Sequence, residues 1–225
     1  MKNIVVFLGL VGCTSSQVNI YGEAKSPGDP SIFVTLCQQQ DETAVALQQA
    51  TETADCAAAG DVLANVSVID FNPSALKTIN LRTVTMLTNI ERLEAYGKGI
   101  VDITPLASLV RMDRLYLMQN NIVDISPLSS MSQLKHIRLD GNQIENISAL
   151  SKLRNLEKIG LDSNKISDFR PLAELPYITD LNTNFNPVDL DKCPDGPDVA
   201  ARLVKYCKKM KKGQGELQDG LDPKQ

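Results

Sequence analysis

The sequence contains no tryptophan, a single histidine and only 4% aromatic residues. Catalytic triads and most zinc sites depend on imidazole groups, and His136 is the only one in this chain. Neither a Gly-x-Ser-x-Gly motif nor a glycine-rich phosphate loop is present. These absences favour a non-enzymatic protein without a metal or cofactor, although a hydrolase with an unrecognised site stays an alternative.

An excess of positive charge is also missing, because 23 Lys and Arg residues face 27 Asp and Glu residues. Nucleic acids and anionic membrane surfaces attract basic proteins, so we expect neither as a direct partner of the folded domain. The hydrophobic fraction of 43% is nevertheless sufficient for a core. We therefore expect a folded monomer.

The first residues have the organisation of an export signal. A short basic start at residues 1–3 precedes the apolar run of residues 4–11, which is too short for a membrane-spanning helix of roughly 20 residues. We expect residues 1–12 to be a signal peptide. Residues 13–30 are rich in Ser, Gly and Pro and are expected to form a flexible tether.

Residues 10–13 read Leu-Val-Gly-Cys, which resembles the lipobox of bacterial lipoproteins. The resemblance implies that Cys13 becomes an acylated N-terminus and that the protein is held in the bacterial cell envelope, in the periplasm or on the surface. Only the lipid anchor would then contact the membrane. An ordinary secretory signal with an incidental Cys13 is the alternative, and it predicts a secreted protein.

Four consecutive segments between Ile90 and Tyr177 align without gaps at a spacing of 22 residues. Apolar residues alternate with polar ones at the start of a segment, as at Leu115 and Leu117, which predicts a short strand with one buried face. Asparagines then occupy one column, where their amides can bond to turn backbone in a buried ladder. They are Asn120, Asn142, Asn164 and Asn186.

A short helix or 3₁₀ turn is expected after each asparagine turn. Ser126 precedes Pro127, and this pair suits the start of a helical turn because proline lacks only an N–H that is unpaired there. Acidic residues recur just before these turns, and we interpret them as turn residues rather than calcium ligands. They are Asp102, Asp124 and Asp168.

The pattern L-x-x-L-x-L-x-x-N-x-I is that of the leucine-rich repeat, and its D-I-S-P-L extension resembles the 22-residue class of bacterial internalins. The resemblance implies an α/β solenoid with a curved parallel sheet on its concave face and short helical turns on its convex face. It also implies that the protein binds another protein. We place the repeats at residues 67–190 and expect the first full unit to be irregular, because Ala95 and Lys98 replace the usual Leu and Asn.

The ends of a solenoid expose its core and need caps. Helical periodicity predicts an N-terminal cap over residues 31–66 and a C-terminal cap over residues 191–212. Residues 213–225 have little apolar content and are expected to be a disordered tail.

Four cysteines besides Cys13 lie near the two caps and none lies within the repeats. Three pairings are possible, and we favour Cys37 with Cys56 and Cys193 with Cys207, because each of these pairs lies near one cap. Export places the chain in an oxidising compartment, where disulfides form. A metal site is the alternative, but these spacings without a nearby histidine match no zinc pattern.

Side chains between the buried leucines should face the concave surface in three columns. Tyr, Met and Arg are enriched in protein interfaces, so Tyr96, Arg114, Tyr116 and Met118 are the strongest candidates for contact with a protein partner. The complete candidate set adds Arg92, Glu94, His136, Arg138, Asp140, Lys158 and Asp162.

Two interpretations of this face remain. Pairs such as Arg138 with Asp140 or Asp162 could simply solvate the sheet. The expected function is therefore binding of a protein by an exported, lipid-anchored repeat module, and the alternative is a structural or envelope-organising lipoprotein without a discrete ligand.

Mass spectrometry of the mature N-terminus tests the export signal. We expect protein purified from membranes to begin at Cys13 and to carry acyl groups, since several acyl chains hold a protein firmly where one binds marginally. A Cys13→Ser variant should leave the membrane fraction. A mature N-terminus further along the chain, free of lipid, would contradict the anchor and make the protein a secreted one.

Overall fold

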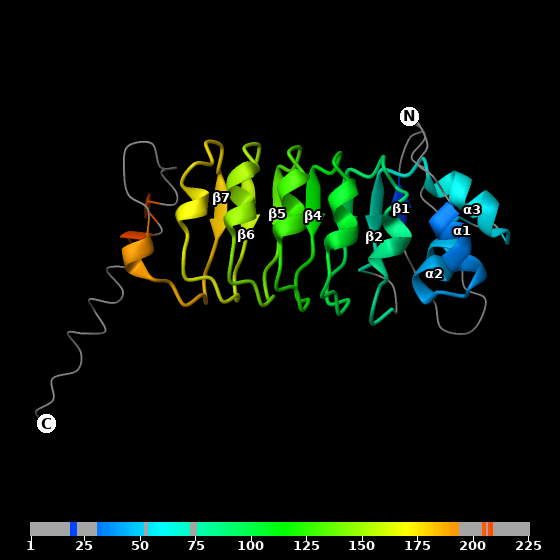
Figure 1. Cartoon of the computed structure of the whole chain (residues 1–225), viewed down its shortest axis with the longest axis horizontal. Coiled ribbons are helices and arrows are strands. Elements are labelled where there is room, and N and C mark those ends of the chain that lie inside the picture. Colours follow the sequence, from blue (N-terminus) through cyan, green and yellow to red (C-terminus); the bar gives the residue numbers. More distant parts are fainter. Residues whose placement is uncertain are drawn as a thin grey trace, which may run out of the picture.

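The repeats stack into a solenoid in which each unit adds one strand on one side and one helical turn on the other (Figure 1). The predicted signal peptide, Cys13 and the predicted tail lie outside the described residues. The computed structural model describes residues 19–21, 31–51, 54–72, 76–193, 204–205 and 207–208.

A sheet with the strand order β1 to β7 runs along the described chain, and strands β2 to β7 are parallel. The register advances by one repeat at each step, so that Leu93 pairs with Leu115 and Leu115 with Ile137. These central residues are fully buried, which confirms the predicted solenoid with one buried strand face. The parallel strands are β2 Val68–Asp70, β3 Arg92–Glu94, β4 Arg114–Tyr116, β5 His136–Arg138, β6 Lys158–Gly160 and β7 Asp180–Asn182.

Strand β1, Asn19–Tyr21, lies within the segment that the sequence predicts to be a flexible tether. It pairs antiparallel with β2, and Ile20 stands opposite Ile69. The tether prediction is therefore wrong for these three residues. Without β1, the outer edge of β2 would present unpaired backbone N–H and C=O groups, and pairing with β1 satisfies them.

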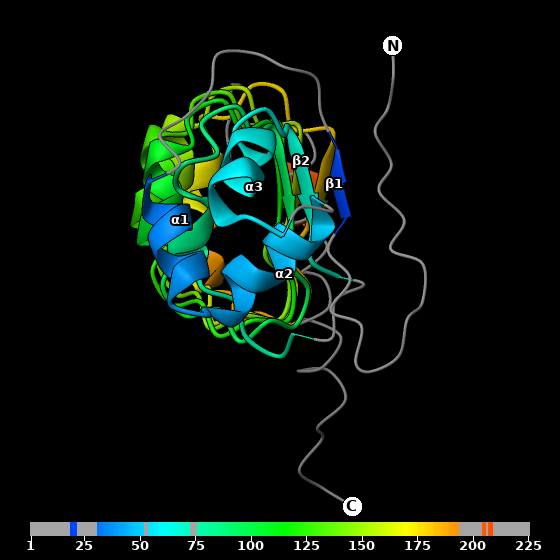
Figure 2. The same cartoon turned by 90° about the vertical axis from the view of Figure 1, so that its right-hand side faces the viewer.

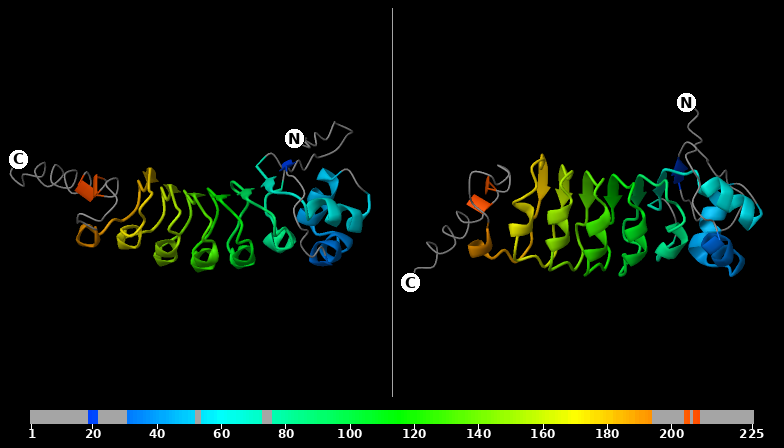
Figure 3. Two further views of the ribbon diagram at one scale, coloured as in Figure 1. Left: turned by 90° about the horizontal axis from the view of Figure 1, so that it is seen from above. Right: turned by 45° about the horizontal axis from the view of Figure 1, so that its top comes forward.

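Turns of 3₁₀ helix form the opposite side of the solenoid (Figure 3). Their leucines at 22-residue spacing, Leu106, Leu128, Leu150 and Leu172, are all fully buried. The turns are η1 Leu81–Val84, η2 Thr104–Ser108, η3 Ser126–Ser130, η4 Ser148–Lys152, η5 Arg170–Leu172 and η6 Leu190–Lys192.

Each of the middle 3₁₀ turns is capped by an acidic or amide side chain two residues before its first residue. Asp124 Oδ1 accepts a hydrogen bond of 2.8 Å from the Ser126 N–H, and the Ser126 hydroxyl donates to Asp124 Oδ2. Asp102, Asn146 and Asp168 make the equivalent backbone contact. The predicted turn role of the aspartates is confirmed, but Ser126 does not itself cap the turn.

The asparagine ladder is present, and it is buried at Asn120, Asn142 and Asn164 but only half-buried at Asn186, which keeps the same bonds. Asn142 Oδ1 accepts from the Ile122 N–H at 3.0 Å, and its Nδ2 donates to the carbonyls of Leu117 and Leu139 at 3.0 and 2.9 Å. Asn120 and Asn164 make the same pattern of contacts and are less than a tenth exposed. Each amide therefore joins the turns of adjacent repeats.

The first full unit is irregular, as expected, because Lys98 takes the ladder position. Its side chain is 5% exposed, and Nζ donates to the Leu76 carbonyl at 3.1 Å. Burial lowers the pKa of the Lys98 ammonium, and the carboxylate of Asp70 opposes this shift. A long cation thus replaces the short amide and still bonds to the preceding turn.

Three helices cover the N-terminal end of the sheet, as the predicted cap requires (Figure 2). Phe33, Leu47 and Leu63 on these helices are fully buried. The Cys37–Cys56 disulfide joins the first helix to the third. None of the described helices is both long and apolar enough to cross a membrane. The helices are α1 Ser31–Gln38, α2 Glu42–Ala50 and α3 Cys56–Leu63.

The C-terminal end is described only in part. The predicted disulfide between Cys193 and Cys207 is present, and both cysteines are buried. Residues 204–205 and 207–208 are helical. The rest of the cap predicted over residues 191–212, beyond Cys193, lies outside the described residues.

Removal of one ladder amide tests its contribution to stability. An Asn142→Ala substitution should lower the free energy of unfolding by roughly 2–4 kcal/mol, because it leaves buried backbone groups without partners. Asn155→Ala is the matched control, since its exposed amide donates only to the Ser132 carbonyl and should cost less than about 1 kcal/mol. Equal losses for the two variants in denaturant unfolding would contradict a special role of the ladder.

Candidate protein-binding face

The strand-lined side of the solenoid, which we call the concave face, carries all the candidate residues in three columns. Arg92, Arg114, His136 and Lys158 are direct neighbours in the strand register and form the first column. Glu94, Tyr116 and Arg138 form the second column by the same pairing. The third column follows directly after the strands, where backbone hydrogen bonds between adjacent repeats continue beyond the strand ends. It consists of Tyr96, Met118, Asp140 and Asp162.

Side chains at the N-terminal end of this face contact one another. The Arg92 guanidinium lies 5.5 Å from the centroid of the Tyr116 ring and also pairs with Glu94. The Tyr116 hydroxyl is 3.5 Å from His136 Nδ1. Tyr96 is 53% exposed, and its backbone N–H is held by Asn72 at 2.6 Å. The result is an ordered surface with an exposed aromatic ring.

Internal contacts engage several candidates further along the face. Arg138 Nε pairs with Asp140 Oδ2 at 2.7 Å, while Asp140 Oδ1 accepts from the Asp162 N–H at 3.2 Å. Asp162 in turn accepts from the Asn184 N–H at 2.6 Å. These bonds favour the interpretation that Asp140 and Asp162 hold adjacent repeats together, while Arg138 pairs with Asp140 of its own repeat.

A hollow of about 350 Å³ opens on this face. Gly160 lies in the second column, and a Cβ atom there would stand only 2.6 Å from Asp140 Oδ2, so the glycine lets the Arg138–Asp140 pair lie over β6. Gly160 is not among the residues predicted from the sequence, although a glycine in a column of large side chains is a recognisable signal. The hollow is lined by Tyr116, Met118, His136, Arg138, Lys158, Ile159, Asp180 and Asn182.

His136 lies between two cations of the first column. Burial, then Lys158, then Arg114 lower the pKa of its imidazole, and Glu157 and Asp113 oppose the shift. Glu157 Oε2 is 4.0 Å from His136 Nε2. The lowered pKa favours the neutral imidazole at pH 7. His136 therefore adds no third positive charge between Arg114 and Lys158 at that pH.

A second hollow, of about 530 Å³, lies between α1 and the convex turns. No sequence pattern predicts this hollow. Its polar groups include Arg82 and Asp102, and Asp102 already caps η2 through Thr104. Within the described residues, no group of three or more His, Cys, Asp or Glu side chains could hold a metal ion.

Titration of His136 tests the electrostatics of the first column. We expect an NMR midpoint below the ordinary value of about 6.5, and a rise of the midpoint in a Lys158→Gln variant. The folded chain binds this proton less readily than the unfolded chain, so the His136 contribution to stability is complete above about pH 6.5 and is lost as pH falls toward the lowered pKa. Lys152→Gln on the convex side is the control, and an equal response to both variants would contradict this account.

Comparisons with known proteins agree with the repeat pattern. A family model described as leucine-rich repeats (2 copies) matches residues 110–152 and 132–174. No curated protein matches the sequence. The fold of the described solenoid does resemble those of solved structures, including two internalins.

One is the internalin InlF from Listeria monocytogenes, with a TM-score of 0.58 and 24% identity over 73% of this chain. The match spans 47% of the InlF chain, so this chain covers about half of that relative. The other is internalin C2 of the same bacterium, with a TM-score of 0.52, 22% identity and coverage of 80% of this chain and 95% of that one. At these identities the likeness is one of fold. The motif, the solenoid and the comparisons together show a leucine-rich-repeat fold that is structurally similar to that of bacterial internalins.

Proposed function

We propose that the chain is a non-enzymatic module that binds a protein partner on its concave face. The observation that supports this most directly is the exposed Tyr96 ring in the third column, next to Met118, with Arg114 and Tyr116 in the adjoining columns of the same face. Interfaces are enriched in these residue types because they offer large contact areas with a polar group attached. Leucine-rich-repeat proteins are typically binding modules, which agrees with this role.

The proposed location is outside the cytoplasm, on a membrane of the bacterial cell envelope. Two disulfides, one near each end of the solenoid, support an oxidising compartment. The lipobox-like residues 10–13 support acylation of Cys13. In this proposal the lipid holds the protein at the membrane while the solenoid stays available to a partner.

A structural role without a discrete ligand is the second candidate. The hydrogen bonds of Asp140 and Asp162 to neighbouring repeats, and the pairing of Arg138 with Asp140, favour it, because side chains engaged within the sheet are less available to a partner. The two candidates differ in what they predict for the opposite end of the face, where Tyr96 and Met118 lie.

Affinity capture with matched variants separates these candidates. Immobilised protein that begins after Cys13 should capture a partner, and an Arg114→Ala, Tyr116→Ala double variant should weaken that capture at least about tenfold, since truncation of interface anchors commonly costs more than 1 kcal/mol. The matched control is Arg154→Ala with Tyr177→Ala. Both control side chains are mostly exposed and lie outside the three columns.

Circular dichroism melting of every variant establishes that each one is folded. The concave-face proposal predicts that the control variant retains the captured partner. An unchanged set of captured proteins with the Arg114→Ala, Tyr116→Ala variant would contradict the proposal and favour the structural role.

A further inference from the structure

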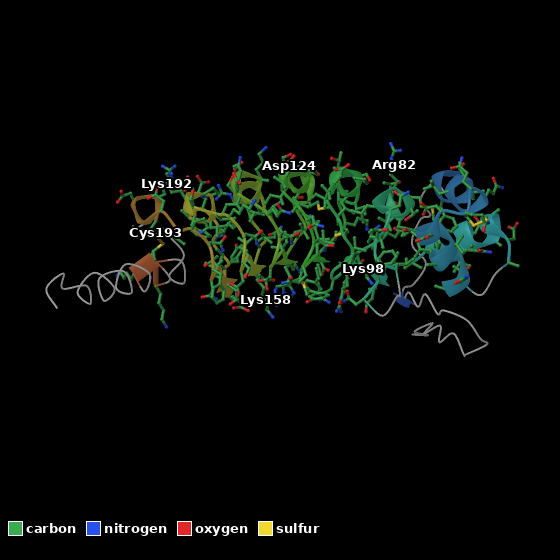
Figure 4. The ribbon with its side chains drawn as sticks, turned by 90° about the horizontal axis from the view of Figure 1, so that it is seen from below. Arg82, Lys98, Asp124, Lys158, Lys192 and Cys193 are labelled. Carbon is green, nitrogen blue, oxygen red and sulfur yellow. A yellow bond between two sulfur atoms is a disulfide. The ribbon has the colours of Figure 1, made fainter. Side chains whose placement is uncertain are left out.

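The strands beside His136 each present one cation toward it. Arg114 on β4 and Lys158 on β6 are its neighbours in the strand register. Among the described residues, the one salt-bridge partner of Arg114 is Asp113, whose Oδ1 lies 3.8 Å from Nε. Lys158 is exposed and forms no salt bridge in the described part of the chain. Figure 4 shows Lys158 on the strand side, opposite Asp124 and Arg82 on the helical side.

The other groups near the imidazole are Glu157 on the approach to β6, Asp113 on the approach to β4, and the Tyr116 hydroxyl. The two cations influence the pKa of His136 more strongly than the two carboxylates do. The charges that act on the imidazole are thus predominantly positive, while Asp180 on β7 is the register neighbour of Lys158 on its far side. An anionic group would be attracted here.

Space for such a group is also present. The hollow of about 350 Å³ borders both His136 and Lys158. Arg138, which could otherwise reach into it, is held by Asp140 over Gly160. Asp180 lies at the β7 side of the hollow, so a carboxylate would be favoured at the β5 side, near His136.

We propose that the hollow between His136 and Lys158 receives an aspartate or glutamate side chain from an acidic segment of the protein partner. This inference rests on the concave-face function proposed above. The carboxylate pairs with Lys158 and lies within the field of Arg114. Charge complementarity favours an acidic segment, because Lys158 forms no salt bridge within the described residues. The hollow of about 350 Å³ has room for one side chain but not for a folded domain.

A carboxylate beside the imidazole favours its protonated form, since an opposite charge nearby raises the pKa of a histidine. Binding and proton uptake at His136 are then coupled, and each strengthens the other. The affinity for an acidic segment should rise as pH falls from 7.5 to 6, within the range where Glu and Asp side chains stay ionised.

His136 is the only histidine of the chain, so its NMR signal reports on this site without overlap. The probe is a synthetic eight-residue peptide of alternating Glu and Gly, added to the folded protein that begins after Cys13. We expect the peptide to raise the His136 midpoint by about one pH unit. A Gln-Gly peptide of the same length and inorganic phosphate at equal ionic strength should leave the midpoint unchanged.

Two substitutions test where on the concave face the Glu-Gly peptide binds. Lys158→Gln should weaken binding of the Glu-Gly peptide roughly two- to fivefold, as loss of an exposed ion pair does. Gly160→Ala should weaken it without any change of charge, because the added methyl displaces Arg138. Lys152→Gln on the convex side is the control and should bind as the unaltered protein does.

Three outcomes would overturn the inference: an equal effect of the Gln-Gly peptide, an equal effect of phosphate, or undiminished binding to the Lys158→Gln variant. If the Arg114→Ala, Tyr116→Ala variant loses its captured partner while the Glu-Gly peptide leaves the His136 midpoint unchanged, the concave-face function stands and the acidic-segment proposal fails. If that variant retains every captured protein, the concave-face function itself fails.

Discussion

The hydrogen bonds of the buried asparagine ladder are the constraint on which the rest of the solenoid depends. Each amide bonds to the turn of its own repeat and to the turn of its neighbours, as Asn142 does with Leu117, Leu139 and Ile122. Because this turn follows each strand at the same position, it ends every strand at the same height, which agrees with the register of the sheet. The columns on the concave face, including Arg114 beside His136, are a consequence of this register.

The repeat and its buried residues could be predicted from sequence because they recur. A 22-residue spacing places identical roles in identical columns, so the strands, the ladder and the convex leucines follow from the alignment alone. The two disulfides also follow, since each predicted cap holds two cysteines. Features that occur once were harder to predict. Three residues at Asn19–Tyr21 carry too little periodicity to mark a strand.

The candidate face was predictable in its columns but not in its contacts. The directions of the side chains decide which cations form ion pairs within the face. Arg92 pairs with Glu94, and Arg138 pairs with Asp140. The hollow arises from a missing side chain at Gly160 together with a neighbour that lies over it. A column alignment shows the glycine but not the bend of Arg138, so the distinction between engaged and available charges needed the structure.

The antiparallel direction of β1 has a consequence for how the array could change in length. Every other pairing in the described sheet is parallel, and each repeat leaves an edge on which the next parallel strand can be laid. β1 occupies the outer edge of β2 in the opposite sense, so a duplicated repeat cannot be added there without displacing it.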